Sequence, residues 1–409
     1  MVKRKKYYNF YYDEAFHDRK ITESKKDKGE LNIENNDQSD NFVSVNIGLP
    51  YHLTEEYFKK YLLFESNVKN ILGIESHKEF KGSTIRKKNF KFGIASFNKN
   101  TLKIYSDFFN FFDDSFFFQI SILNKFEFLI SSIIEEMSSP VQIDIKNFTY
   151  SFVKILNIYK NKDLVSVLLN PQSNRFDVID TILSLLDEII EHNKDVERKT
   201  EEVHAAKTIK NILISTDFTT KTKSQYSWNY TQGIHGLLLL LEELKIKEKS
   251  VVLYIDREDN TVLAAQNYNF KKVVSVDSKE CIGVRIADIW SNFIGRFLKS
   301  IEDEYKEDWD VEETKTRIAE RRILSAKWFD LTKDQYNLYK KIADIFYIRQ
   351  YYWTIQTNKY PGYTTTFMTL IYYVGREHYS YEEFKNIDLE THRERFNSMN
   401  YHRESEHYN

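Results

Sequence analysis

The sequence predicts an α/β protein in which a mixed β-sheet is flanked by helices, with a large helical insertion and a helical C-terminal extension. Short stretches rich in β-branched and aromatic residues alternate with longer stretches of helical periodicity. One of the short stretches, "VVLYID" at 251–256, is apolar at nearly every position. That pattern is typical of a central strand that is covered on both faces.

Five stretches are expected to form the strands of this sheet. Each is dense in aromatic or β-branched residues, and the second is closed by Pro50. A charged and polar segment follows the first stretch and is expected to form a long loop. The five expected strands are residues 7–15, 40–50, 115–124, 250–256 and 270–276.

Helices are expected between and after these strands. Thr54 begins an amphipathic helix with Glu55 and Glu56 in its first turn. The helical stretch after residue 125 is too long for one crossover connection, so it is interpreted as an insertion. The expected divisions are two segments of the core, residues 1–125 and 246–300, with the helical insertion 126–245 between them and a helical C-terminal extension 301–409 after them.

Composition points to a protein that works in a reducing compartment. The 59 basic and 61 acidic side chains nearly cancel, so no overall basic field favours a polyanion. The single cysteine, Cys281, excludes an intrachain disulfide and a cysteine-based zinc site. The basic N-terminus lacks the apolar core of a signal peptide, and the leucine run 237–241 is far shorter than a membrane span. We therefore expect a cytoplasmic protein without a membrane partner.

Four acidic residues are candidates for one site. Asp13 and Asp256 each stand at the carboxyl end of a hydrophobic strand, and parallel neighbours would bring both to one edge of the sheet. Asp288 borders the apolar stripe of the helix 283–298, from which it could point back toward that edge. Glu79 stands beside a Gly-Ser turn.

Crowded carboxylates point to a hard divalent cation. Oxygen ligands suit Mg²⁺ or Mn²⁺, and two such ions about 3.5 to 4 Å apart can activate water and stabilise the leaving oxygen of a phosphodiester. Each acid also has an ordinary explanation. Asp13 and Asp256 could bond their own backbone in turns, Glu79 could be a solvated loop residue, and Asp288 could pair with Arg285 on the helix surface.

Four short motifs add a family to this interpretation. "YYDEA" at 11–15, "EFKGS" at 79–83, "LYIDRED" at 253–259 and "DSKECIGVRIAD" at 277–288 resemble, in order and wording, the domain-of-unknown-function 3800 family, which has an RNase H-like fold. The resemblance covers roughly residues 7–125 and 250–297. The chain departs from the family pattern where Ala15 and Phe16 replace Ser-Gly and where Arg285 replaces Gln.

The resemblance implies an RNase H-like mixed sheet and a set of metal ligands. Carried over to this sequence, Asp13, Glu79, Asp256 and Asp288 are the catalytic ligands of Mg²⁺ or Mn²⁺. Glu14 and Asp277 are auxiliary acids, and Glu14 is counted among the candidate metal ligands. Since neighbouring strand residues point to opposite faces, Asp13 and Glu14 can share the site only if the strand bulges or ends there.

The expected function is a divalent-metal-dependent nuclease acting on DNA or RNA, and the resemblance also implies a role as an effector associated with antiviral defence or mobile elements. Lys81, Arg257, Lys279 and Arg285 could contact phosphates. The aromatic and basic stretch 347–363 could stack on single-stranded nucleic acid or could be core. His392, His402 and His407 are expected in a solvated tail.

An alternative function belongs to a different class. The same fold could serve as a non-catalytic adaptor that binds a protein or nucleic acid, with the helical regions also available for a protein partner or a second copy of the chain. The sequence leaves open the choice between DNA and RNA and between endo- and exonucleolytic cleavage.

Overall fold

The centre of the molecule is a six-stranded mixed sheet. The computed structural model describes residues 7–15, 41–135, 137–138, 144–170, 172–218, 230–309, 324–348, 353–357 and 362–406. The strand order is β8-β7-β1-β2-β4-β9, in which β2 is antiparallel to both β1 and β4 and the other pairs are parallel. The strands are β1 (Tyr8–Ala15), β2 (Asn41–Pro50), β4 (Phe117–Asn124), β7 (Val251–Asp256), β8 (Lys272–Val276) and β9 (Trp353–Thr357).

The α/β class and all five expected strands are confirmed, and β9 is an addition. It lies within the aromatic and basic stretch 347–363 and pairs along β4 at the edge of the sheet. Some residues of that stretch, and the polar loop expected after the first strand, fall outside the described residues. The sequence does not predict β9, because a five-residue edge strand has too short a pattern to distinguish it from a buried helix segment.

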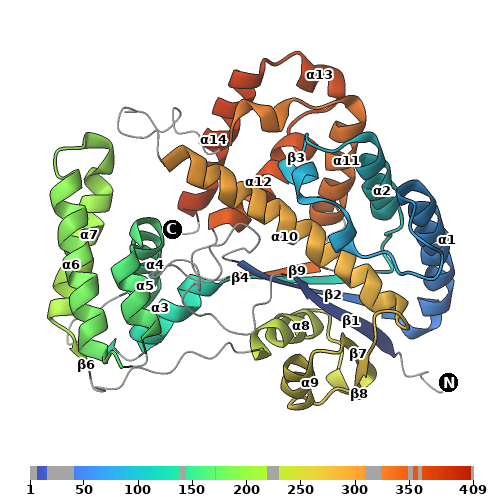
Figure 1. Cartoon of the computed structure of the whole chain (residues 1–409), viewed down its shortest axis with the longest axis horizontal. Helices are drawn as coiled ribbons and strands as arrows, with labels where there is room; N and C mark the ends of the chain where they lie inside the picture. Colours follow the sequence, from blue (N-terminus) through green and yellow to red (C-terminus); the bar gives the residue numbers. More distant parts are fainter. Residues whose placement is uncertain are drawn as a thin grey trace.

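Helices cover both faces of the sheet (Figure 1). One face carries α1, α2, α10 and the C-terminal helices, which share one apolar core with β2 and β4. The other face carries α8 and α9, which pack on Phe10, Tyr12 and Leu253. The helices of both faces are α1 (Thr54–Leu72), α2 (Lys99–Asn110), α8 (Thr231–Glu243), α9 (Asp259–Gln266), α10 (Ile282–Trp309), α11 (Lys333–Ala343), α12 (Gly362–Arg376), α13 (Tyr381–Lys385) and α14 (Leu389–Glu406).

The helix α10 lies directly against β1 in the middle of the sheet. A Cβ added at Gly283 would stand 2.2 Å from the ring of Tyr11 on β1, so only glycine allows this contact. The apolar stripe expected for this helix is buried, from Ile286 to Phe297 and on to Ile301. The helix extends beyond the expected end at residue 298 to Trp309.

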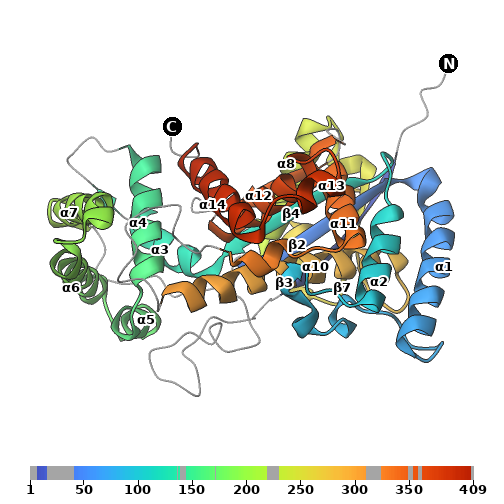
Figure 2. The same ribbon diagram turned by 90° about the horizontal axis from the view of Figure 1, so that it is seen from above.

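The helices α3 to α7 form a second unit beside the sheet (Figures 1 and 2). Their apolar faces pack on one another in a cluster that includes Phe126, Leu156, Val178 and Leu213. This unit corresponds to most of the expected insertion 126–245, but α8 at its end packs on the sheet instead. The unit comprises α3 (Lys125–Glu135), α4 (Ile145–Tyr159), α5 (Lys162–Leu169), α6 (Arg175–Asn193) and α7 (Thr200–Ile214), with the short strands β5 (Met137–Ser138) and β6 (Asp217–Phe218).

The C-terminal extension belongs to the main core. Trp328, Tyr339 and Phe367 pack in the same cluster as the α10 stripe, and the extension supplies β9. His392 is fully buried, so its expected place in a solvated tail is wrong. Its ring contacts the Tyr373 hydroxyl and the Phe384 carbonyl, and burial lowers its pKa to about 4.

None of the helices in the described part of the chain combines the length and the apolar character needed to cross a membrane.

The Gly283 contact yields a stability prediction. Gly283→Ala should lower the free energy of unfolding by about 1 to 3 kcal/mol, because the new methyl group overpacks against the Tyr11 ring. Urea unfolding followed by circular dichroism measures the change. In a Tyr11→Leu background, which removes the ring, the same substitution should cost less, and equal costs in both backgrounds would contradict the contact.

Candidate functional site

Asp13 and Asp256 end two neighbouring parallel strands on the same face of the sheet. The register pairs Tyr11 with Tyr254 and Tyr12 with Ile255, so the next residues on each strand are Asp13 and Asp256. The Tyr11 and Tyr254 rings stack with centroids 5.0 Å apart on the face that carries α10. Because side chains alternate along a strand, both aspartates point to this face. The parallel pairing that would bring both acids to one edge of the sheet is therefore present.

Asp288 on α10 binds the segment that follows Glu79. The backbone N–H of Gly82 donates to Asp288 Oδ2 at 2.6 Å, and Asn292 Nδ2 donates to Oδ1 at 2.9 Å. Gly82 opens the short 3-10 helix η3 (Gly82–Thr84). A Cβ at Gly82 would lie 2.6 Å from the Asn292 Cβ and 2.9 Å from the Asp288 carbonyl oxygen. The glycine therefore lets this segment lie directly on α10.

The same helix reaches Asp13. Ser291 Oγ donates to Asp13 Oδ2 at 2.8 Å. Burial raises the pKa of Asp13 well above its ordinary value, and repulsion from Asp288, Glu14 and Asp256 raises it further, while the Ser291 hydrogen bond lowers it. The carboxylates of Asp13 on β1 and Asp288 on α10 are thus close enough that a negative charge on one disfavours a charge on the other.

The pKa of Asp288 is also raised, but more neighbouring groups act to lower it. Burial raises the pKa of Asp288 to about 6, and the nearby Glu79 carboxylate adds to this rise. The Gly82 N–H, the Lys81 ammonium and the Arg296 guanidinium act in the opposite direction. Burial therefore outweighs the neighbouring donors and cations in setting the pKa of Asp288.

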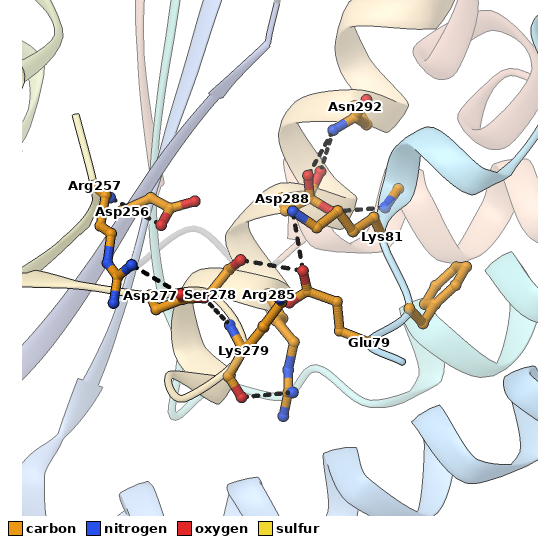
Figure 3. A network of polar contacts seen from close by, with 12 residues as sticks. Glu79, Lys81, Asp256, Arg257, Asp277, Ser278, Lys279, Arg285, Asp288 and Asn292 are labelled. Atoms are coloured by element: carbon orange, nitrogen blue, oxygen red, sulfur yellow. Dashed lines mark hydrogen bonds and ion pairs between the residues drawn. The ribbon is translucent and has the colours of Figure 1, made fainter. Parts of the chain in front are cut away.

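Glu79 brings a third carboxylate to this region (Figure 3). Its side chain is only 8% exposed, and its Oε1 contacts Lys81 Nζ at 3.0 Å and the Ser278 hydroxyl at 3.4 Å. Its Oε2 is buried and has no hydrogen-bond partner within the described structure. A buried carboxylate oxygen without a partner is costly, and a cation would satisfy it.

Asp256 has a more modest environment. The backbone N–H of Arg257 donates to its Oδ1 at 2.9 Å, which is the local turn contact that an aspartate at a strand end commonly makes. Its carboxylate nevertheless interacts with Asp13 and Lys81. Figure 3 shows Asp256 on the β7 side of the site and Asp288 on the α10 side.

The buried ion pair between Glu65 and Arg285 holds the chain segment next to Glu79 in place. Glu65 on α1 accepts the Phe80 N–H at 3.1 Å and lies 3.6 Å from Arg285 Nε. Arg285 Nη1 donates to the Lys279 carbonyl at 3.3 Å. The pair holds the segments that carry Glu79 and Ser278. Glu65 was missed in the sequence because it reads as the surface partner of Lys69 one turn along.

Arg285 does not have the exposed position that is expected of a phosphate contact. Its side chain is 10% exposed and is held by Glu65, the Lys279 carbonyl and the face of the Tyr61 ring. The expected surface pair between Arg285 and Asp288 is not what the structure places there, because Arg285 points to α1. In the sequence, Arg285 borders the apolar stripe of the helix. An arginine at such a position can pair with a buried carboxylate as readily as it can face solvent.

Glu14 lies on the opposite face of the sheet from the other acids. It accepts a hydrogen bond from Tyr12 at 2.5 Å, and Tyr12 packs under α8. The pairing of β1 with β2 runs through Ala15 without a bulge. Glu14 is thus excluded from the set of side chains that could hold one cation with Asp13.

The remaining predicted residues lie at the rim. Asp277 accepts the Lys279 N–H at 2.9 Å, and this hydrogen bond together with Arg257 and Lys279 lowers the pKa of Asp277. Arg257 contacts Asp277 at 3.3 Å and is 69% exposed. Lys279 is also exposed. Asp277 thus caps the turn before α10, and the two basic residues face solvent near the acids.

Two further polar residues belong to the site and were not singled out in the sequence. Ser291 and Asn292 follow Asp288 by three and four positions and bond Asp13 and Asp288. The signal in the sequence was a serine, Ser291, among the apolar residues of this helix. The structure buries it fully, and a buried hydroxyl group needs a hydrogen-bond partner.

The arrangement gathers the acids without forming a finished metal site. Within the described residues, no three His, Cys, Asp or Glu side chains stand close enough to form a metal-binding group. Comparison with protein families, curated proteins and solved structures found no match to this chain.

The charge of Asp288 leads to a prediction about pH. Its folded-state pKa is raised, so the stability it contributes is present below about pH 4 and is lost as pH rises through about 6. At pH 7.5, Asp288→Asn should therefore raise the free energy of unfolding of the metal-free protein. This effect of the substitution should be about 1 to 3 kcal/mol more favourable at pH 7.5 than at pH 4. Urea unfolding in the presence of a chelator measures this difference.

Asp277→Asn provides a control of opposite sign. The folded-state pKa of Asp277 is lowered, so its contribution is present at neutral pH and is lost as pH falls. This variant should be less stable than the parent chain at pH 7.5 and closer to it at pH 4. If Asp288→Asn changes the free energy of unfolding by the same amount at both pH values, the charge of Asp288 does not destabilise the folded protein.

Proposed function

We propose that this chain is a Mg²⁺- or Mn²⁺-dependent nuclease that hydrolyses phosphodiester bonds of DNA or RNA. The observation that carries the proposal is the meeting of Asp13 and Asp288, both buried and mutually repelling, beside a Glu79 oxygen that lacks a partner. Carboxylate oxygens are hard donors, and hard divalent cations such as Mg²⁺ and Mn²⁺ prefer such ligands. We further propose that it works in the cytoplasm as an effector in antiviral defence or mobile-element biology.

The topology supports an RNase H-like core. β1, β2 and β4 are consecutive antiparallel strands, and β7 and β8 follow in parallel on the other side of β1. This is the arrangement expected for that fold, with the α3 to α7 unit inserted between its third and fourth strands. The site lies at the carboxyl ends of β1 and β7, where ligands of open α/β sheets bind.

The chain's residues divide into ligands and supports. Asp13, Asp256, Asp288 and Glu79 would hold the cation, and Ser291, Asn292 and the Gly82 N–H orient the aspartates. A bound Mg²⁺ or Mn²⁺ would supply Lewis acidity for activating water and for stabilising the leaving oxygen. Lys81, Arg257 and Lys279 stand where they can contact substrate phosphates.

A non-catalytic adaptor is the second candidate function. Two observations favour it: the described residues contain no group of three close metal ligands, and Lys81 neutralises some of the charge of Glu79. In this alternative the fold binds a protein or nucleic-acid partner, with the α3 to α7 unit as the added surface. Metal titration separates the two candidates, because the adaptor needs no cation.

The nuclease proposal predicts a metal-dependent activity that one substitution removes. Purified protein should degrade single- or double-stranded DNA or RNA when Mn²⁺ or Mg²⁺ is added. Asp256→Asn should lower the rate by at least about 100-fold, since even residues that only orient metal ligands cost about 10 to 100-fold when changed. Gel assays on labelled oligonucleotides measure the rate.

A matched control is Asp195→Asn. Asp195 is exposed just beyond the end of α6, in the unit beside the sheet, and this substitution should leave the rate unchanged. Equal rates for Asp256→Asn and the parent chain would defeat the nuclease assignment. No cleavage together with no heat of Mg²⁺ or Mn²⁺ binding would favour the adaptor.

A further inference from the structure

We propose that Lys81 is an internal counter-ion of the acidic site, which occupies it in the metal-free protein and is displaced when a divalent cation enters. Displacement frees its ammonium group for a substrate phosphate. This inference rests on the proposed nuclease function and adds a step to it. The class of ligand that Lys81 then meets is a phosphodiester.

The position of Lys81 fits a counter-ion. Its Nζ lies 3.0 Å from Glu79 Oε1 and interacts electrostatically with Asp288 and Asp256. Figure 3 shows its side chain lying beside Asp288, with its end joined to the Glu79 carboxylate. One ammonium group thus faces three of the four acids from the rim of the site.

Its exposure allows it to leave. The Lys81 side chain is 47% exposed, whereas that of Glu79 is 8% exposed. The backbone beside it is fixed, because the next residue, Gly82, is bound to Asp288 and packed on α10. Rotation about the four-carbon lysine stem is therefore enough to carry the charge out of the site.

Three arginines near the site have partners other than the four acids. Arg285 is bound by Glu65 and the Lys279 carbonyl, and Arg296 is buried with its Nη2 donating to the Ser83 carbonyl at 2.9 Å. Arg257 pairs with Asp277 at the rim. Lys81 is thus the one among these four that combines contact with a site carboxylate and a partly exposed side chain.

The exchange is favoured by charge. A single ammonium leaves Glu79 Oε2 without a partner and Asp13 repelled by Asp288, so the acids remain incompletely neutralised. A divalent cation carries twice the charge and accepts several oxygen ligands at once. The released ammonium then exchanges a carboxylate oxygen for a phosphate oxygen, which is a charge-assisted contact of the same kind.

The test measures cation binding in the absence of substrate. Lys81→Met keeps the length of the side chain and removes the charge, so Mn²⁺ should bind the variant about 2- to 10-fold more tightly than the parent chain by isothermal titration calorimetry. In a chelator the variant should melt at a lower temperature, and its gain on adding Mn²⁺ should be larger. Its KM for an oligonucleotide should rise.

Two further variants separate displacement from a general field effect. Arg257→Met removes a nearby charge that contacts no proposed ligand and should leave Mn²⁺ affinity within about 2-fold of the parent value. Lys81→Arg restores the charge and should return the affinity toward the parent value. An equal gain in affinity for Arg257→Met would overturn the specific role of Lys81.

The outcomes also distinguish failure of the counter-ion role from failure of the proposed nuclease function. If the parent chain binds Mn²⁺ and Lys81→Met binds it equally or more weakly, the counter-ion role is wrong and the nuclease proposal stands. If the parent chain binds neither Mn²⁺ nor Mg²⁺, the nuclease proposal fails and the counter-ion role falls with it.

Discussion

The close seating of α10 on β1 is the constraint on which the site depends. Gly283 lets the helix lie against the Tyr11 ring, and this contact brings the following turns over the ends of β1 and β7. Ser291 then reaches Asp13, and Asp288 receives the Gly82 N–H. A larger residue at Gly82 or Gly283 would move one of the chain segments that carry the acids, because the neighbouring atoms leave no room for a Cβ.

Charge repulsion is the cost of this arrangement. Burial and repulsion from neighbouring carboxylates raise the pKa of Asp13 and Asp288. Ser291 offsets part of this rise at Asp13, and the Gly82 N–H, Lys81 and Arg296 offset part of it at Asp288. Buried carboxylates with a raised pKa cluster at functional sites, where burial and like charges are arranged together. The Glu65–Arg285 pair shows the contrast, since there each charge has a buried partner.

The appended regions relate to the sheet in different ways. The α3 to α7 unit has its own apolar core and adds surface beside the sheet, while the C-terminal helices share the core of α10 and complete the sheet with β9. Loss of the C-terminal region would expose apolar side chains such as Trp328 and Phe367. The α3 to α7 unit is the better candidate for contacting a partner without disturbing the acids.

The sequence by itself determined the local elements: five of the six strands of the sheet, the helix starting at Thr54, the aspartates at the ends of β1 and β7, and the apolar stripe that Asp288 borders. These follow from periodicity and end signals among near neighbours. Only the tertiary structure decided that Arg285 faces Glu65, that Glu14 turns away with Tyr12, that α8 covers the sheet and that 353–357 joins its edge. Such pairings depend on which surfaces meet over long separations in the chain, and no local pattern specifies the partner.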